Sequence, residues 1–229
     1  MVWIIFAVVL LACVYLPGLW VRQVLRKYSS PADRYREQGS GAALARHLLD
    51  RHDLPHVKVE ETETGDHYDP EAKAVRLTRD NYSGHSLTAV TVAAHEVGHA
   101  IQDARQEKLF NVRQRLVRFA VRGEKIAGFM MMAAPLIFVV TRAPQAGAAV
   151  LLLGVGSMLL ATLVHLVTLP VELDASYGKA LPILRDGNYL HDGDMKYARR
   201  ILRAAALTYV AGSLASLLNL GRWLTVLRR

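Results

Sequence analysis

Cysteine is almost absent from this sequence, with Cys13 the single example among 229 residues. One thiol cannot form an intramolecular disulfide, which excludes an oxidised extracellular scaffold. Internal repeats and low-complexity tracts are also lacking. Hydrophobic residues are abundant, at 52% with a mean hydropathy of +0.17, yet 21% of the chain is charged. A soluble core this apolar does not need so many charges, so we expect segregation into membrane helices and a polar domain.

Four apolar runs without Lys, Arg, Asp or Glu predict about four transmembrane helices. The first, 2–21, has 20 residues, enough to cross roughly 30 Å of hydrocarbon. No basic residue precedes it, so we interpret it as an uncleaved anchor rather than a secretory signal. The second and third, 126–141 and 146–169, are joined by a short turn and predict a helical hairpin. The fourth is 204–220.

The basic residues indicate how the chain is oriented. The net charge is +8, but most basic residues flank the apolar runs, where they would meet anionic lipid headgroups rather than nucleic acid. Near the span ends, the side that holds 22–125 and 170–203 carries 17 basic residues, and the other side carries four. The positive-inside rule therefore predicts a multi-pass protein of the plasma (inner) membrane with its polar segments in the cytoplasm.

The polar segment between the first two spans has the pattern of a small α+β domain. Ser40 is a predicted N-cap for a helix that extends to Asp50. Alternation predicts strands at 57–60 and 74–77, separated by a turn-rich stretch. A second helix is predicted from Ser86 to Arg105, with Ser86 or Ser83 as its N-cap. The predicted domains are an anchor at 1–21, a cytoplasmic domain at 22–125, a membrane hairpin at 126–169, a cytoplasmic segment at 170–203, and a last helix with its tail at 204–229.

The helix that begins at Ser86 carries the motif His95-Glu96-Val97-Gly98-His99. Positions i and i+4 share a helix face, so both imidazoles can reach one metal ion at about 2 Å. Glu96 lies beside the first imidazole and can take a proton from a water molecule that the metal activates. The strand, cap and helix before the motif are the context of a zincin. We therefore predict a catalytic metal site, for which zinc suits the donors best.

A catalytic zinc site needs a third protein ligand and an open fourth position. Positions 102 and 105 are Gln and Arg, so the metzincin extension of the motif is absent. Glu172 lies at the inner end of the third span, on the side predicted for the motif. A carboxylate at a membrane boundary needs a reason, and metal ligation is one, with solvated helix capping as the alternative.

Three stretches together closely resemble the YugP-type family of membrane zinc metallopeptidases: DHYDP at 66–70, AAHEVGHAIQ at 93–102 and LPVELDAS at 169–176. The resemblance covers nearly the whole chain. It implies a neutral zinc peptidase with one zinc per chain, His95 and His99 as ligands, Glu96 as catalytic base and Glu172 as third ligand. Such an arrangement is that of a gluzincin, similar to the HtpX-type membrane peptidases.

The chain departs from that broader class at one position. There, an acid usually follows the third ligand by four residues and orients a metal-bound histidine. Here position 176 is Ser, and Asp174 follows Glu172 by only two residues. Asp174 is therefore a candidate to support a ligand by another route, or to replace Glu172 as the ligand. The resemblance favours Glu172.

These patterns predict a mostly α-helical integral membrane protein with about four transmembrane helices and a small α+β zincin-like domain of two or three short strands. We expect a zinc metallopeptidase, an endopeptidase that acts on protein or peptide substrates, membrane proteins among them. Strand 74–77 is expected to hold the substrate backbone. Further candidates for lining the cleft or stabilising an oxyanion are His67, Tyr68 and Tyr177.

Two alternative functions belong to other classes. The first is a site-2-type intramembrane peptidase, because Arg185-Asp186-Gly187 is similar to the Asp-Gly ligand element of such enzymes. However, this stretch is polar rather than apolar. The second is a non-catalytic metal-binding scaffold in the membrane, which would be expected to lose Glu96 or a ligand.

Overall fold

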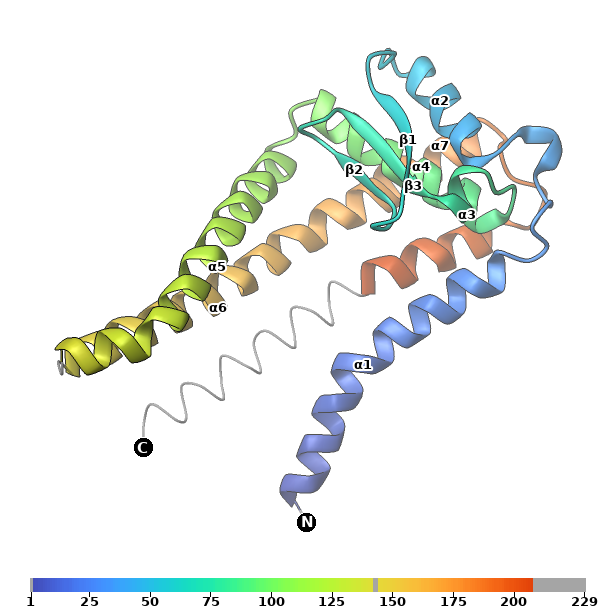
Figure 1. Cartoon of the computed structure of the whole chain (residues 1–229). Coiled ribbons are helices and arrows are strands. Elements are labelled where there is room, and N and C mark those ends of the chain that lie inside the picture. Colours follow the sequence, from blue (N-terminus) through green and yellow to red (C-terminus); the bar gives the residue numbers. More distant parts are fainter. Residues whose placement is uncertain (1, 142–143, 208–229) are drawn as a thin grey trace. The chain divides into compact units, whose positions relative to one another are not determined.

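The computed structural model describes residues 2–141 and 144–207 (Figure 1). Residues Tyr15–Phe110 and Pro170–Thr208 form one compact unit, here called the sheet unit, which contains every predicted site residue. The rest of the chain forms a second unit. The elements are α1 (Val2–Tyr28), η1 (Arg36–Gln38), α2 (Gly41–Arg51), β1 (Lys58–Thr62), β2 (His67–Asp69), β3 (Ala74–Thr78), α3 (Arg79–Tyr82), α4 (Leu87–Ala104), α5 (Lys108–Thr141), α6 (Pro144–Leu173), the π-helix η2 (Asp174–Ala180) and α7 (Leu181–Asp186). A helix also covers 195–207.

Three of the four predicted membrane spans lie on long helices. These are α1, α5 and α6, with 27, 34 and 30 residues. The fourth span, 204–220, and the turn at 142–145 lie mostly or partly outside the described residues. Among the described residues, one stretch, Leu159–Asp186, is long and apolar enough to cross a membrane. The chain is therefore mostly helical with a small sheet, and the four-span arrangement and the predicted domain boundaries stay predictions.

The two predicted helices of the sheet unit begin at their predicted caps. The Ser40 hydroxyl accepts a hydrogen bond from the Ala43 amide at 3.2 Å, and α2 starts at the next residue. Ser86 caps α4 in the same way, accepting from the Ala89 amide at 3.1 Å. Each cap satisfies an amide that the first helical turn leaves without a partner. The two helices also pack together.

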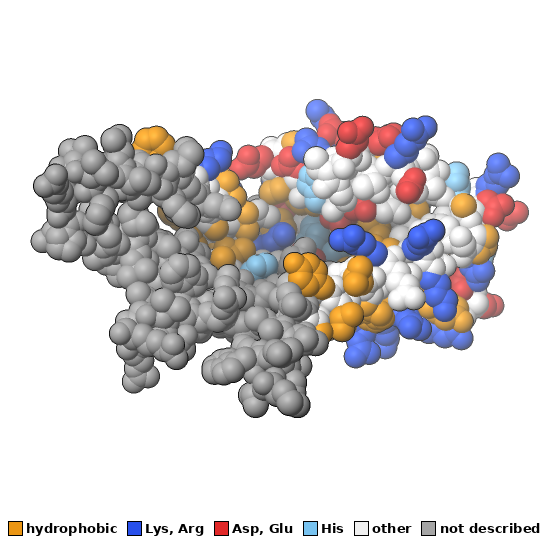
Figure 2. All heavy atoms as spheres, turned by 60° about the horizontal axis from the view of Figure 1, so that its bottom comes forward, with side chains coloured by type: hydrophobic (Ala, Val, Ile, Leu, Met, Phe, Trp, Pro, Cys, Tyr) orange, Lys and Arg blue, Asp and Glu red, His pale blue; other side chains and the backbone are white. Residues whose placement is uncertain are grey.

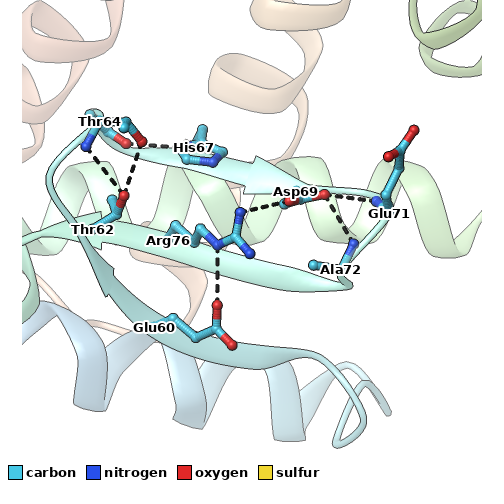
Figure 3. Close-up of polar contacts among 9 residues, drawn as sticks. Glu60, Thr62, Thr64, His67, Asp69, Glu71, Ala72 and Arg76 are labelled. Atoms are coloured by element: carbon cyan, nitrogen blue, oxygen red, sulfur yellow. Dashed lines mark hydrogen bonds and ion pairs between the residues drawn. The ribbon is translucent and has the colours of Figure 1, made fainter. Parts of the chain in front are cut away.

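The sheet has three strands in the order β1-β3-β2. β1 runs parallel to β3, and β2 forms an antiparallel hairpin with β3. The stretch between the two predicted strands was expected to be rich in turns, and it also contains β2, with bends before it and a turn after it. In that turn, the Asp69 carboxylate accepts from the Glu71 and Ala72 amides at 2.8 and 3.0 Å. Figure 3 shows Arg76 on the middle strand reaching Asp69 on one side and Glu60 on the other, at 2.7 and 3.1 Å. These charges connect all three strands.

The prediction that strand 74–77 receives the substrate is wrong. β3 is the central strand, with β1 hydrogen-bonded along one side and β2 along the other. A substrate strand can only add to a backbone edge whose amides and carbonyls are not already paired. The available edges in this sheet belong to β1 and β2.

An ion pair between the exposed Arg34 and the buried Asp194 joins the chain after α1 to the start of the 195–207 helix. The Arg34 guanidinium donates two hydrogen bonds to the Asp194 carboxylate, at 2.6 and 2.8 Å, and the Tyr35 hydroxyl donates a third at 2.6 Å. Tyr35 is fully buried, and burial together with Asp194 raises its pKa to about 12. Burial tends to raise the pKa of Asp194, but Arg34 and Tyr35 hold it below its ordinary value.

We expect Asp194→Asn to destabilise the folded protein by about 2 kcal/mol at neutral pH, because it leaves a guanidinium unpaired beside a buried tyrosine. A lowered carboxyl pKa stabilises the fold above the unfolded pKa, and this contribution is lost as pH falls through the folded value. The difference between variant and wild type should therefore be full at neutral pH and shrink as the pH falls through the lowered pKa of Asp194. Thermal unfolding of detergent-purified protein measures it. Asp192→Asn, at an exposed neighbour, is the control, and equal losses in both variants would contradict the assignment.

Candidate metal centre

Helix α4 carries both imidazoles of the motif on one face. The rings of His95 and His99 are 4.7 Å apart between centroids and nearly perpendicular, at 77°. Both side chains are buried, with exposures of 7% and 5%. The helix is buried on most sides because α2, the sheet and η2 all pack against it. This enclosure removes both imidazoles from bulk water.

Glu172, in the last turn of α6, completes the cluster. Its Oε2 atom lies 3.2 Å from His95 Nε2 and 3.4 Å from His99 Nε2. The three donor atoms all lie within 4.8 Å of one another. Tetrahedral zinc with bonds of about 2.1 Å would separate neighbouring ligand atoms by about 3.4 Å. The spacing and the donor set of two imidazoles and a carboxylate therefore fit a zinc ion.

The charge of Glu172 depends on these neighbours. The carboxylate is 3% exposed, and burial alone would raise its pKa. His99 and His95 overcome this effect and hold the pKa of Glu172 well below its usual range. The group is therefore kept in the ionised form that binds metal.

Each imidazole has a hydrogen-bond partner on the side away from Glu172. His95 Nδ1 lies 3.2 Å from Ser176 Oγ, and His99 Nδ1 lies 2.9 Å from Gln102 Oε1. These contacts suit the tautomer in which Nδ1 carries the hydrogen and donates it. The Nε2 lone pairs then face the centre of the cluster, as metal ligation requires.

The sequence did not predict a role for Gln102 or Ser176. Gln102 stood out only as a missing glycine of another motif and Ser176 only as a missing acid. The available signal was spacing, because Gln102 follows His99 by three residues and Ser176 follows Glu172 by four. The π-helix η2 begins directly after α6 and carries Ser176 to His95. Single π-helical turns often occur at functional sites.

Asp174 reaches the site through Gln102. The Gln102 amide donates to Asp174 Oδ2 at 2.7 Å and to the Val171 carbonyl at 2.9 Å. Buried Lys179 contacts the same carboxylate and also pairs with Glu107 at 2.9 Å. Burial would raise the pKa of Asp174, but Lys179 and Gln102 lower it. The described residues therefore bring Glu172, and not Asp174, against both imidazoles.

The other predicted cleft residues are distributed around the unit. The Tyr68 hydroxyl donates to Asp103 at 2.6 Å, so it connects β2 to the far end of α4, and burial with Asp103 raises its pKa. His67 is half-buried on β2, with Nδ1 2.8 Å from the Gly65 carbonyl. Tyr177 on η2 is half-buried and lines a separate basic cavity. The described partners of Tyr68 and His67 are thus Asp103 and Gly65, outside the cluster of His95, His99 and Glu172.

Gly98, between the two histidines, allows α4 and η2 to approach closely. A Cβ atom at this position would lie 2.8 Å from the Ala175 carbonyl oxygen, which is shorter than real contacts allow. Ala175 lies between Glu172 and Ser176, so the same close approach sets the position of both side chains. The glycine of the motif is therefore a packing requirement of the metal centre.

The helix that carries the HExxH motif and a glutamate from a later helix bring His95, His99 and Glu172 together as a cluster able to hold a metal ion. Residues 2–228 match the family described as "Putative neutral zinc metallopeptidase", and the chain belongs to this family. It is similar to the Bacillus subtilis (strain 168) protein named "Putative membrane protease YugP", with 35% identity over 195 residues that cover 82% of this chain and 80% of that protein. No solved structure matches the chain.

We expect Gly98→Ala to weaken zinc binding about 10- to 100-fold, because the added methyl group pushes η2, and with it Glu172 and Ser176, away from α4. Competition with a chromophoric chelator on detergent-purified protein measures the affinity. Gly18→Ala is the matched control, since a Cβ there meets nothing within 4 Å. Wild-type affinity in Gly98→Ala would contradict the packing argument.

Proposed function

We propose that this chain is a zinc-dependent membrane metallopeptidase of the gluzincin type, and an endopeptidase for protein or peptide substrates. His95, His99 and Glu172 hold one zinc ion, and Glu96 is the general base. The observation that carries the proposal is the buried meeting of Glu172 with both imidazoles, at 3.2 and 3.4 Å. Membership of a zinc metallopeptidase family supports the choice of metal and of reaction.

Zinc bound at these three side chains would supply a Lewis acid that polarises a substrate carbonyl and lowers the pKa of a water molecule. Glu96 takes a proton from that water and passes it to the leaving amine. Its side chain is 6% exposed, so bulk water does not compete for the proton. Ser176 and Gln102 orient the two imidazoles, and Asp174 positions Gln102.

The substrate backbone adds as a strand at the outer edge of β2 in this proposal. β2 is an edge strand, and its Tyr68 hydrogen bond to Asp103 keeps it against α4. A peptide paired with β2 lies extended beside the HExxH helix, held by backbone hydrogen bonds that are independent of its sequence. His67 on the same strand is the candidate to contact it.

A multi-pass arrangement with the site on the cytoplasmic side of the plasma membrane completes the proposal. It is supported by the basic residues near the predicted span ends, 17 on the side of the motif and four on the other. The membrane-protease name of the Bacillus relative gives further support.

The site-2-type alternative has less support. Asp186 of its Asp-Gly element lies at the end of α7, with a 64% exposed side chain that pairs with Arg185 at 2.7 Å. It does not belong to the cluster of His95, His99 and Glu172. In addition, α4 is enclosed by α2, the sheet and η2 rather than by apolar helices alone.

We expect Glu96→Gln to keep one zinc per chain and to lower casein cleavage about 10²- to 10⁴-fold, because it removes the base but no ligand. Glu172→Ala should lose both zinc and activity. Metal analysis and cleavage assays on the same detergent-purified samples measure the two effects, with exposed Glu61→Gln as control. Wild-type activity in Glu96→Gln would refute the mechanism. Zinc content at the wild-type level in Glu172→Ala would indicate that Asp174 is the third ligand instead.

We expect Gln102→Met to lower zinc affinity about 10- to 100-fold while the fold is kept, because the apolar side chain has a similar size but cannot orient His99. Chelator competition measures the loss, and circular dichroism checks the fold. Gln38→Met is the matched control, since that amide contacts only the exposed His191. Equal affinities for Gln102→Met and wild type would show that His99 needs no orienting partner.

A further inference from the structure

The sheet unit has a second cavity of about 830 Å³ that is strongly basic. This volume lies within the range of small-ligand sites. Its lining residues come from α1, η2 and the 195–207 helix, and they are Trp20, Tyr177, Lys196, Arg199, Arg200, Arg203 and Leu207. None of them carries a negative charge. The cavity therefore has the chemistry of an anion site.

The four cations lie on one face of one helix. Lys196, Arg199, Arg200 and Arg203 are spaced by three, one and three residues, so they follow a single helical stripe. Among the described residues, no carboxylate forms an ion pair with any of the four. The nearby Asp194 is already bonded to Arg34 and Tyr35. Lys196 lies over the Tyr197 ring, 4.9 Å from its centroid, but positive charge that no carboxylate neutralises attracts an anion from outside the chain.

The opposite wall of the cavity is apolar and aromatic. Trp20 on α1 lines it, and on the same helix Leu16 and Leu19 are 59% and 57% exposed. In the sequence, α1 is free of charge over 2–21 and becomes basic immediately afterwards, at Arg22. The cavity is thus placed where an apolar helix becomes a basic one, which is the position of lipid headgroups in a membrane protein.

Two of the elements that line the cavity, α1 and the 195–207 helix, lie side by side within the sheet unit (Figure 1). The Tyr28 and Tyr197 rings are 5.2 Å apart between centroids, which fixes α1 against the 195–207 helix. Figure 2 shows Lys and Arg side chains close to hydrophobic ones on one face of the molecule. Arg199 and Arg203 also lie near the Tyr177 hydroxyl. Burial raises the pKa of this hydroxyl above its ordinary value, and the two guanidiniums reduce the rise.

We propose that this cavity binds the phosphate of an anionic phospholipid headgroup. Arg199, Arg200 and Arg203 contact the phosphate oxygens, and guanidinium forks suit this geometry. The acyl chains extend along the exposed leucines of α1. A lipid fits better than an acidic peptide because the cations lie beside exposed leucines at the end of a long uncharged helix, where a phosphate and its acyl chains occur together.

Quenching of Trp20 fluorescence by brominated lipids tests the proposal on the full chain, with Trp3 and Trp223 replaced by Phe. The protein is titrated in mixed detergent micelles with brominated phosphatidylglycerol or brominated phosphatidylcholine. We expect saturable quenching with an apparent affinity about 30-fold higher for phosphatidylglycerol. In Arg199→Gln/Arg203→Gln this preference should fall to about threefold or less. The matched control is Arg36→Gln/Lys58→Gln, which removes two exposed charges elsewhere and should keep the preference.

Equal quenching by both lipids, or an unchanged preference in Arg199→Gln/Arg203→Gln, would overturn the proposal. Displacement of phosphatidylglycerol by inorganic phosphate or glycerol phosphate, at matched ionic strength, would assign the cavity to a soluble phosphate ester instead. Displacement by a hexaglutamate peptide would make it a substrate pocket. Zinc content is measured in every variant and should stay at the wild-type level, so a failure here is distinct from a failure of the metal centre.

Discussion

The contact of helix α4 with the π-helix η2 at Gly98 is the constraint on which the rest of the site depends. The two segments approach so closely that a Cβ atom at Gly98 would meet the Ala175 carbonyl at 2.8 Å. Ala175 follows Glu172 by three residues and directly precedes Ser176. This one backbone contact therefore positions both the Glu172 carboxylate and the Ser176 hydroxyl against the His95 imidazole. The caps of α2 and α4 and the buried Asp194 contact keep the surrounding elements in place.

The histidines of this centre are oriented by neutral groups. The Ser176 hydroxyl and the Gln102 amide contact the two Nδ1 atoms. The charged groups of Asp174, Lys179 and Glu107 lie behind Gln102 and do not contact these Nδ1 atoms directly. A neutral partner orients an imidazole without adding negative charge beside the metal ligands. Glu172 is therefore the carboxylate directly against the two imidazoles. In the proposed function, a zinc ion held by this donor set would keep a net positive charge, which suits the polarisation of a carbonyl.

Local patterns predicted the parts of the fold that local chemistry determines. Ser40 and Ser86 were found as caps because a cap is a short-range hydrogen bond, and His95 and His99 because their spacing matches one helical turn. The order of the strands was not predictable, since the pairing of β3 with both neighbours depends on contacts across the sheet rather than on alternation. Gln102 and Ser176 were missed for a related reason: their partners are fixed only when η2 packs against α4, and no periodicity encodes a π-helical turn.

The separation of the ligands along the chain has a consequence for how the protein holds together. His99 and Glu172 are 73 residues apart, and the stretch between them contains nearly all of α5 and α6. A metal ion bound by both residues would hold the two ends of this long loop together in the folded state alone, so its binding free energy would add to the stability of the fold. We expect the metal to stabilise the fold in addition to its proposed role in catalysis. Depletion of zinc then costs the protein its resistance to unfolding and to digestion, in addition to its chemistry.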